Sequence, residues 1–255
     1  MPHLQIDLTG KRALVTGGGR GIGQAIAKAL ARCGADVAVN YRTDQQSAQQ
    51  TVDEILRDDG RACAIQADVS IAEEVKKLFS AIEERFGDGL DILINNAGGL
   101  ERMAVDQMSE ELWDRNMAVN AKSVFLCTQA AWSRLPDSDG RIVNVTSIAA
   151  RNGGVADSIH YAAAKAAVST FTRGCAKALA PRGITVNGIA PGVIYTDFHK
   201  RNTSQQALER VLSNIPLGRL GDADDCAGAV LLLCSPQASY VTGEIIEING
   251  GLHMD

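Results

Sequence analysis

Short apolar runs rich in β-branched residues alternate along the chain with longer segments of helical periodicity. Seven such runs occupy residues 13–16, 37–39, 62–66, 91–95, 141–145, 184–189 and 245–248. Strands that alternate with helices form parallel sheets, and helices on both faces of a sheet bury its strands from both sides. Buried strands of this kind are apolar throughout, as these are. The pattern predicts an α/β protein with a doubly wound, seven-stranded parallel sheet flanked by helices.

One domain accounts for the chain. Its 255 residues are 45% hydrophobic, which is enough to form the core of a single α/β domain. The segment after the first strand shows one apolar helical face, which Gly34 ends, and no repeat or long linker interrupts the pattern. The polar segment 198–206 follows the sixth strand. We therefore expect a single domain over residues 1–255, with a substrate lid around 194–215.

Charge and composition exclude several classes of binding partner. The formal net charge is -5 and the chain has no basic stripe, so we expect no nucleic-acid partner. Residues 1–11 lack the signature of a signal peptide, and no run reaches the ~18 apolar residues of a membrane span. The six cysteines form no C-x-x-C pair, and no set of side chains has metal-ligand spacing. These observations predict a cytoplasmic protein with reduced thiols, no metal, no membrane contact and a small-molecule substrate.

A glycine-rich segment lies between the first strand and the first helix. Residues 16–23 read T-G-x-x-x-G-x-G, with glycines at Gly17, Gly21 and Gly23 and with Ile22 starting the apolar helical face. Glycine allows a tight turn and a close approach of the backbone to a pyrophosphate, whose charge the free N–H groups of a helix N-terminus stabilise. The segment predicts a dinucleotide cradle and places the chain among Rossmann folds.

The end of the second strand bears on which dinucleotide binds. An acidic residue there would hydrogen-bond the ribose hydroxyls of NAD and repel a 2′-phosphate. This chain has Asn40, Tyr41 and Arg42 at that point. Arg42 and Arg20 are both placed to bind a 2′-phosphate through charge-assisted hydrogen bonds. We therefore expect NADP(H), with NAD(H) as the alternative.

A tyrosine and a lysine four residues apart indicate acid–base chemistry. Tyr161 and Lys165 stand on one face of a predicted helix. A neighbouring ammonium favours phenolate, so we expect Lys165 to lower the pKa of Tyr161 and to fit it for general acid–base catalysis. Ser147 follows the strand 141–145, at the carboxyl end where open α/β sheets bind ligands, and its hydroxyl is placed to hold a substrate oxygen.

Together these motifs resemble the short-chain dehydrogenase/reductase family. The matching motifs run in the family's order over essentially the whole chain: the glycine segment, residues 68–69, residues 95–98, Ser147 with Tyr161-x-x-x-Lys165, and Pro191 with Gly192. The separation of Ser147 from Tyr161 is one residue more than the family's commonest spacing. The extra residue lies in the loop 149–160, where it would shape the substrate pocket.

The resemblance implies roles for individual residues. Asn120 would support a water-linked proton relay to Lys165, which would also bind the nicotinamide ribose, and Asp68 would contact the adenine ring. The full set of catalytic residues it implies is Asn120, Ser147, Tyr161 and Lys165. The implied cofactor-binding residues are Gly17, Arg20, Gly21, Ile22, Gly23, Tyr41, Arg42, Asp68, Val69, Asn95, Ala97, Gly98, Tyr161, Lys165, Pro191, Gly192, Val193 and Thr196. It further implies a homotetramer in which helices around 120–132 and 161–180 pair between subunits.

The resemblance implies an NAD(P)(H)-dependent oxidoreductase and leaves its substrate open. The tail from residue 216 to residue 251 looks like that of 3-oxoacyl-acyl-carrier-protein reductases. The acidic segment 136–140, which we expected beside the active-site mouth, would repel an acidic carrier. Other runs are similar to reductases of sugar-derived keto acids and to polyol dehydrogenases that work in the oxidative direction, in which Arg151 and His199 would meet a carboxylate or hydroxyls. A dinucleotide-sensing regulator without turnover is a further alternative.

Overall fold

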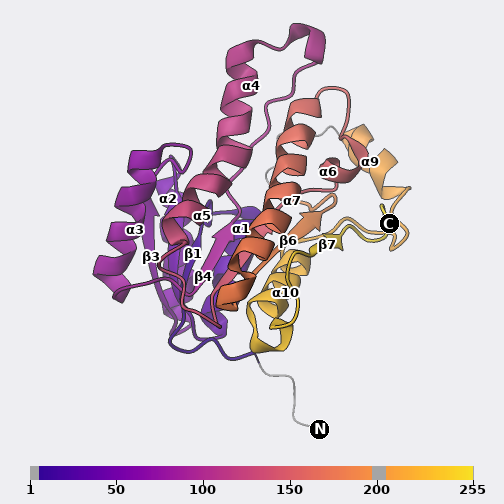
Figure 1. The fold of residues 1–255 in the computed structure, drawn as a ribbon. Helices are drawn as coiled ribbons and strands as arrows, with labels where there is room; N and C mark the ends of the chain where they lie inside the picture. Colours follow the sequence, from indigo (N-terminus) through magenta and orange to yellow (C-terminus); the bar gives the residue numbers. More distant parts are fainter. Residues whose placement is uncertain (1–5, 197–204, 255) are drawn as a thin grey trace.

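Seven parallel strands form one sheet in the order β3-β2-β1-β4-β5-β6-β7 (Figure 1). The computed structural model describes residues 6–196 and 205–254. The strands are β1 (Arg12–Val15), β2 (Asp36–Tyr41), β3 (Arg61–Gln66), β4 (Ile92–Asn95), β5 (Arg141–Val145), β6 (Thr185–Pro191) and β7 (Ile245–Ile248). The predicted sheet is confirmed, and each predicted strand lies within two residues of its observed bounds.

Helices cover both faces of the sheet (Figure 1). One face is packed by α1 (Gly21–Arg32), α2 (Gln45–Arg57) and α10 (Ala223–Cys234). The other is packed by α3 (Ala72–Phe86), α5 (Ser123–Ala131) and α7 (Ile159–Leu179), with α4 (Glu110–Met117) running into α5 through a π-helical turn, η2 (Ala118–Lys122). The short α6 (Ala149–Asn152) follows β5, and α9 (Gln205–Leu212) precedes α10 in the chain. The doubly wound arrangement is therefore confirmed.

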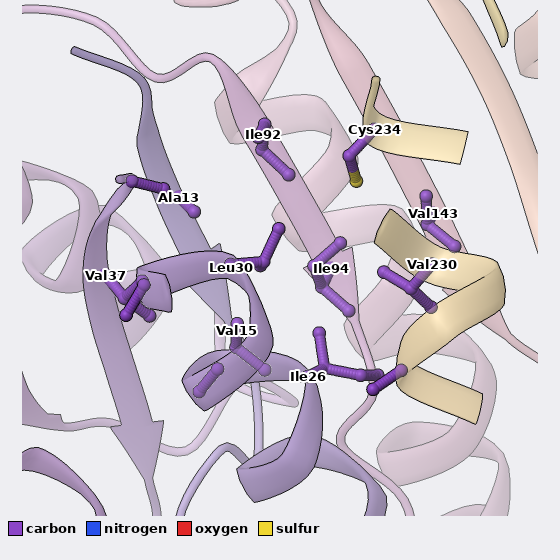
Figure 2. Close-up of a cluster of buried hydrophobic side chains, with 14 of the residues drawn as sticks. Ala13, Val15, Ile26, Leu30, Val37, Ile92, Ile94, Val143, Val230 and Cys234 are labelled. Carbon is purple, nitrogen blue, oxygen red and sulfur yellow. The ribbon is translucent and has the colours of Figure 1, made fainter. Parts of the chain in front are cut away.

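The larger core cluster fixes α1 against the sheet. Figure 2 shows Ile26 and Leu30 of α1 and Val230 of α10 pointing toward the side chains of the central strands. All three are fully buried, as are Val15 of β1 and Ile94 of β4. Such packing removes on the order of several hundred Å² of apolar surface from water. Because the interior is closely packed, α1 can take only one position relative to β1 and β4. The start of α1 is thereby held at the sheet's carboxyl edge.

The strand order creates a crevice at that edge. β1 continues outward to β2 and β3, whereas its other neighbour, β4, continues in the opposite direction to β5, β6 and β7. Open α/β sheets bind their ligands at such a reversal, outside the carboxyl ends of the strands. The segments that follow β1, β4, β5 and β6 all emerge there. They are the segments in which the sequence predicted the cofactor-binding and catalytic residues.

The acidic segment 136–140 lies at the opposite edge of the sheet, so its predicted place beside the active-site mouth is wrong. It immediately precedes β5 and therefore sits at the amino end of that strand. Asp139 pairs there with Lys11, next to the first residue of β1, and Asp137 pairs with Arg182 at 2.7 Å. These two ion pairs hold the segment 136–140 against the far edge of the sheet. Its charge therefore does not weigh against an acidic carrier at the active site.

Most of the cysteines lie in the core. Cys127, Cys175, Cys226 and Cys234 are buried, and the remaining two are half-buried; all six are free. Burial in apolar surroundings raises the pKa of the Cys127 thiol to about 12, which disfavours the reactive thiolate. None of the helices described is both long and apolar enough to cross a membrane.

Leu30 provides a test of the core. Leu30→Ala leaves a cavity between α1 and the sheet and should lower the free energy of unfolding by about 2–5 kcal/mol. Leu56→Ala, at a side chain that is 50% exposed on α2, is the matched control and should cost less than about 1 kcal/mol. Urea unfolding of both variants measures the difference. Equal losses would show that α1 is not anchored as described.

Candidate active site

The loop between β1 and α1 forms a glycine cradle. Gly17 and Gly21 have φ angles of +62° and +56°, which non-glycine residues rarely adopt. Gly23, in the first turn of α1, lies so close to the loop that a Cβ atom there would stand 2.4 Å from the carbonyl oxygen of Gly17. Ile22, between them, packs against the core. The glycines that the sequence singled out are thus required by backbone conformation and by close packing.

The N-terminus of α1 is suited to an anion. Arg20 is the N-cap residue with extended backbone, and among the described residues no side chain caps the helix. The first turn, starting at Gly21, carries no acidic residue. Its N–H groups have no acceptor within the helix and lie at the positive end of the helix dipole. Phosphate oxygens are acceptors of the kind that such a turn binds.

A single hydroxyl group joins the loops that follow β1 and β4. The Oγ1 of Thr16 accepts hydrogen bonds from the backbone N–H groups of Asn96 (2.9 Å) and Ala97 (3.0 Å), and donates to the carbonyl of Ile94. In return, the amide nitrogen of Asn96 donates to the carbonyl oxygens of Thr16 (2.9 Å) and Gly17 (3.1 Å). Sequence reasoning did not assign a role to either side chain.

Asn40, at the carboxyl end of β2, supports the cradle from the other side. Its Oδ1 accepts a hydrogen bond from the N–H of Gly17 at 3.3 Å, and its Nδ2 donates to the carbonyl oxygen of Ala67 at 3.1 Å. The side chain is only 2% exposed. Sequence reasoning considered Asn40 only as a position without charge, whereas the structure shows a buried amide that links β2, β3 and the cradle.

The residues predicted to bind the adenosine end lie around the ends of β2 and β3. Tyr41 is the last residue of β2, and the exposed Arg42 follows it, with its guanidinium 3.8 Å from the carboxylate of Asp68. Val69 is buried beside Asp68. Arg20, in the cradle, has its Nη1 atom 3.6 Å from Oδ2 of Asp44, at the start of α2. The strand itself ends without a carboxylate, as the sequence predicted.

Asn95 has a different environment from the one predicted. The family resemblance places it among the cofactor-binding residues, but its side chain is 2% exposed and donates to Oδ1 of Asn144 at 2.8 Å. Asn144 in turn donates to Oγ1 of Thr172 at 2.8 Å. These bonds connect β4, β5 and α7 below the site, because a buried amide must find hydrogen-bond partners. The following residues, Ala97 and Gly98, carry the loop back to the surface of the site.

The predicted catalytic side chains come together beyond β4 and β5. Ser147 follows β5 and makes a hydrogen bond to the hydroxyl of Tyr161. Lys165 lies one turn further along α7, is 3% exposed, and donates from Nζ to the carbonyl oxygen of Val145 at 2.8 Å. The Nζ atom is 5.8 Å from the centre of the Tyr161 ring. The geometry therefore unites a hydroxyl, a phenol and an ammonium at one point.

Asn120 joins this group through the loop after β4. It sits in the π-helical turn η2, fully buried, and its amide bonds both the N–H (3.1 Å) and the carbonyl oxygen (2.8 Å) of Gly99. A Cβ on Gly98 would stand 2.8 Å from Oδ1 of Asn120 and 3.4 Å from Nζ of Lys165. Glycine at position 98 thus lets Asn120 and Lys165 approach one backbone segment from two sides.

The predicted effect of Lys165 on Tyr161 is not what the structure shows. Burial raises the pKa of Tyr161 to about 12, and the hydrogen bond from Ser147 opposes this shift without reversing it. Burial also lowers the pKa of Lys165 to about 8, because an ammonium ion loses hydration there. Loss of water is the largest cause of the pKa shift for both groups. Tyr161 therefore stays protonated at neutral pH, while Lys165 titrates close to it.

The segment after β6 borders the cradle. Pro191 ends β6, and the carbonyl oxygen of Val193 accepts the N–H of Gly221 at 3.0 Å. The side chain of Thr196 lies beside Gly21. A Cβ atom added at Gly21 would be 3.5 Å from the Cβ atom of Thr196. This contact brings the predicted nicotinamide-side residues, including Gly192, next to the N-terminus of α1. Within the predicted lid, 194–215, residues 197–204 lie outside the described residues.

Arg151 is already paired. Its Nε lies 2.9 Å from Oε1 of Glu247 in β7, and Oε2 of Glu247 accepts from Asn249 at 3.2 Å. This ties α6 to the C-terminal tail, so the guanidinium is held by the chain itself, contrary to the expectation that it meets a substrate carboxylate. No spacing in the sequence predicts a pair 96 residues apart. The second residue of that expectation, His199, lies outside the described residues.

Comparison with known proteins identifies the family. A family model described as enoyl-(acyl carrier protein) reductase matches residues 17–253. The 3-oxoacyl-(acyl-carrier-protein) reductase of Vibrio cholerae is 42% identical over 250 residues, which cover 98% of this chain and 100% of the relative. The cradle and the Ser147, Tyr161 and Lys165 cluster define a Rossmann-fold oxidoreductase. With these matches, the chain belongs to the short-chain dehydrogenase/reductase family.

Two solved structures show the same fold. A dehydrogenase/reductase from Sinorhizobium meliloti superposes with a TM-score of 0.93 at 40% identity, covering 98% of both chains. A short-chain dehydrogenase from Burkholderia cenocepacia, solved in complex with NADP, gives a TM-score of 0.90 at 40% identity and covers 96% of this chain and 98% of its own. The resemblance identified from the motifs is thereby confirmed.

Thr16 tests the connection between the two loops. Thr16→Val keeps the shape of the side chain but leaves the N–H groups of Asn96 and Ala97 without an acceptor, so it should cost about 2–3 kcal/mol of stability. Thr16→Ser keeps the acceptor and should cost about 1 kcal/mol, for one buried methyl group. Amide hydrogen exchange at Asn96 and Ala97 should accelerate in the valine variant alone. Equal exchange in both variants would contradict the assignment.

Proposed function

We propose that the protein is an NADP(H)-dependent reductase that transfers a hydride to the carbonyl carbon of a small substrate while Tyr161 gives a proton to the carbonyl oxygen. One observation carries this proposal. The hydroxyl of Ser147, the phenol of Tyr161 and the ammonium of Lys165 meet beside Gly98, at the same sheet edge as the phosphate cradle. A protein that only senses a dinucleotide needs the cradle but not this cluster.

The residues present fit a 2′-phosphorylated nicotinamide dinucleotide. The cradle between Gly17 and Gly23 has the backbone shape and the uncapped helix N-terminus that a pyrophosphate requires. The end of β2 offers Tyr41 where a carboxylate would favour NAD, and Arg20 and Arg42 supply positive charge nearby. When bound, the cofactor supplies the hydride. The relative from Burkholderia cenocepacia, which binds NADP, supports the same choice.

The side chains have distinct tasks in this proposal. Ser147 orients the substrate oxygen against the phenol of Tyr161, which is protonated at neutral pH and acts as the general acid. Lys165, held at the end of β5 by the carbonyl of Val145, stabilises the phenolate left behind through its positive charge. Lys165 then passes a proton to that phenolate, and Asn120 supports the relay that returns a proton to the lysine. Asn120 holds the loop at Gly99 in place.

Two substrate classes follow from the relatives and the site. The relative from Vibrio cholerae acts on 3-oxoacyl groups carried by acyl carrier protein, and the acidic segment 136–140, once placed at the far edge, does not oppose such a partner. Sugar-derived keto acids remain the second class. The pairing of Arg151 with Glu247 removes one of the groups expected to recognise them. We therefore propose a 3-oxoacyl-type ketone as the substrate.

A cytoplasmic homotetramer is the assembly that we propose. The helices predicted to pair between subunits carry apolar side chains that the single chain leaves partly open, among them Phe125 and Trp132, with exposed fractions of 43% and 36%. Phe125 makes an edge-to-face contact with Phe171 of α7, with ring centres 6.5 Å apart, so the two helices form one apolar surface. Apolar surfaces of this kind favour association between subunits.

A substrate panel combined with Tyr161→Phe tests the proposed function. NADPH oxidation should be observed with 3-oxoacyl thioesters in a panel that also holds sugar-derived keto acids, aldoses and diketones. Tyr161→Phe should lower turnover ~10²-fold or more while NADPH binding stays nearly unchanged, because only the proton donor is lost. Tyr240→Phe, at a fully exposed tyrosine, is the control and should be fully active. NADPH binding without turnover of any substrate would instead support a dinucleotide sensor.

The pKa of Lys165 predicts how reduction depends on pH. Its pKa of about 8 means that the ammonium is present below pH 8 and is lost as the pH rises through that value. Because the charge stabilises the forming phenolate, kcat/KM for reduction should be constant near pH 6–7 and fall above about pH 8. Lys165→Arg keeps its charge in this range, so its residual activity should lack the decline. A wild-type profile that stays flat to pH 9 would contradict this role.

A further inference from the structure

We propose that Asp44 sets how strongly this protein discriminates between a dinucleotide with a 2′-phosphate and one without it, by opposing that phosphate at Arg20. The inference rests on the proposed use of NADP(H) and assigns a role to a residue outside the motifs. Asp44 is the N-cap residue of α2, and its Oδ2 lies 3.6 Å from Nη1 of Arg20. A carboxylate thus faces one of the two arginines expected to bind the phosphate.

The carboxylate is fixed in place by the helix that it caps. Oδ1 of Asp44 accepts the backbone N–H of Ser47 at 3.1 Å, and Oδ2 accepts the Ser47 hydroxyl at 2.8 Å. These bonds hold the negative charge at the N-terminus of α2, where the helix dipole also favours an anion. A position that would attract a phosphate is therefore filled by a side chain of the protein itself.

Packing keeps this helix end next to the cradle. An added Cβ on Gly19, the residue before Arg20, would stand 3.0 Å from the backbone of Ala48 in the first turns of α2. Thr51, one turn further, donates from Oγ1 to the carbonyl oxygen of Gly19 at 3.2 Å. Asp44 therefore keeps its distance from Arg20 because the two segments are joined on the buried side, and an exposed ion pair alone would not ensure this.

The consequence concerns selectivity and leaves the chemistry unaffected. A phosphate bound to Arg20 must share that guanidinium with Asp44 and is repelled by its charge, whereas an unphosphorylated ribose experiences no such repulsion. The second arginine, Arg42, likewise lies near a carboxylate, that of Asp68. With both cations partly neutralised, we expect the protein to favour NADP(H) only moderately and to accept NAD(H). The two carboxylates would then explain why NAD(H), the alternative cofactor from the sequence, is also accepted.

Binding of NADP⁺ and NAD⁺, measured by titration calorimetry, tests the role of Asp44 without any turnover. Asp44→Asn and Asp44→Ser both keep a capping group and remove the charge. Each should tighten NADP⁺ binding by about three- to fivefold and change NAD⁺ binding by less than about twofold, and the gain should shrink at high salt. Asp53→Asn, which removes one charge from the same helix about 13 Å away, is the matched control and should leave the ratio unchanged.

Each other result has a defined meaning. Unchanged NADP⁺ binding in both Asp44 variants would overturn the proposal. Weaker binding in both would also overturn it and would show instead that Asp44 orients Arg20 for the phosphate. An equal gain in Asp53→Asn would also overturn it, because the effect would then come from the overall charge. If the wild-type protein binds neither dinucleotide, the proposed function fails as well, whereas a missing effect at Asp44 alone leaves the proposed function intact.

Discussion

The hydroxyl of Thr16 is the interaction on which the site depends. It accepts two backbone N–H groups from the loop after β4, and Asn96 returns two bonds to the loop after β1, so neither loop can move without the other. The first loop carries the phosphate cradle. The second places Gly98 against Asn120 and Lys165. The phosphate site and the proton-transfer site are thereby held in a constant position relative to each other. Catalysis that depends on positioning requires this.

The sequence was sufficient wherever the determining physics is local. Strands buried on both faces give apolar runs, glycines mark positive φ angles, and a four-residue spacing puts Tyr161 and Lys165 on one helix face. It failed at particular contacts between distant segments. The Thr16–Asn96 bonds, the burial of Asn95 and the pairing of Arg151 with Glu247 join residues far apart in the chain, and no periodicity encodes them. The segment 136–140 was misplaced because acidity does not reveal which edge of a sheet a turn occupies.

The pKa values of Tyr161 and Lys165 are another property that the sequence alone did not predict. Sequence spacing predicts that the two groups are neighbours but not how far each is removed from water. Desolvation moves the phenol and the ammonium in opposite directions, each toward its neutral form. Tyr161 is therefore protonated at neutral pH, next to a Lys165 ammonium whose pKa of about 8 lies only slightly above neutral pH. The fold achieves this by pointing both side chains from α7 toward the carboxyl ends of β4 and β5 and by anchoring the lysine on Val145.

The π-helical turn at Ala118–Lys122 separates two helices that otherwise form one continuous rod. Such a turn holds one residue more than an α-helical turn, so the helical phase of everything after it is rotated by about 100°. Asn120 can face the catalytic loop while Phe125, five residues later, faces outward from α5. The turn thus lets one rod of helix present Asn120 to the catalytic loop and then bury most of α5 against the sheet, while Phe125 stays open to the surface.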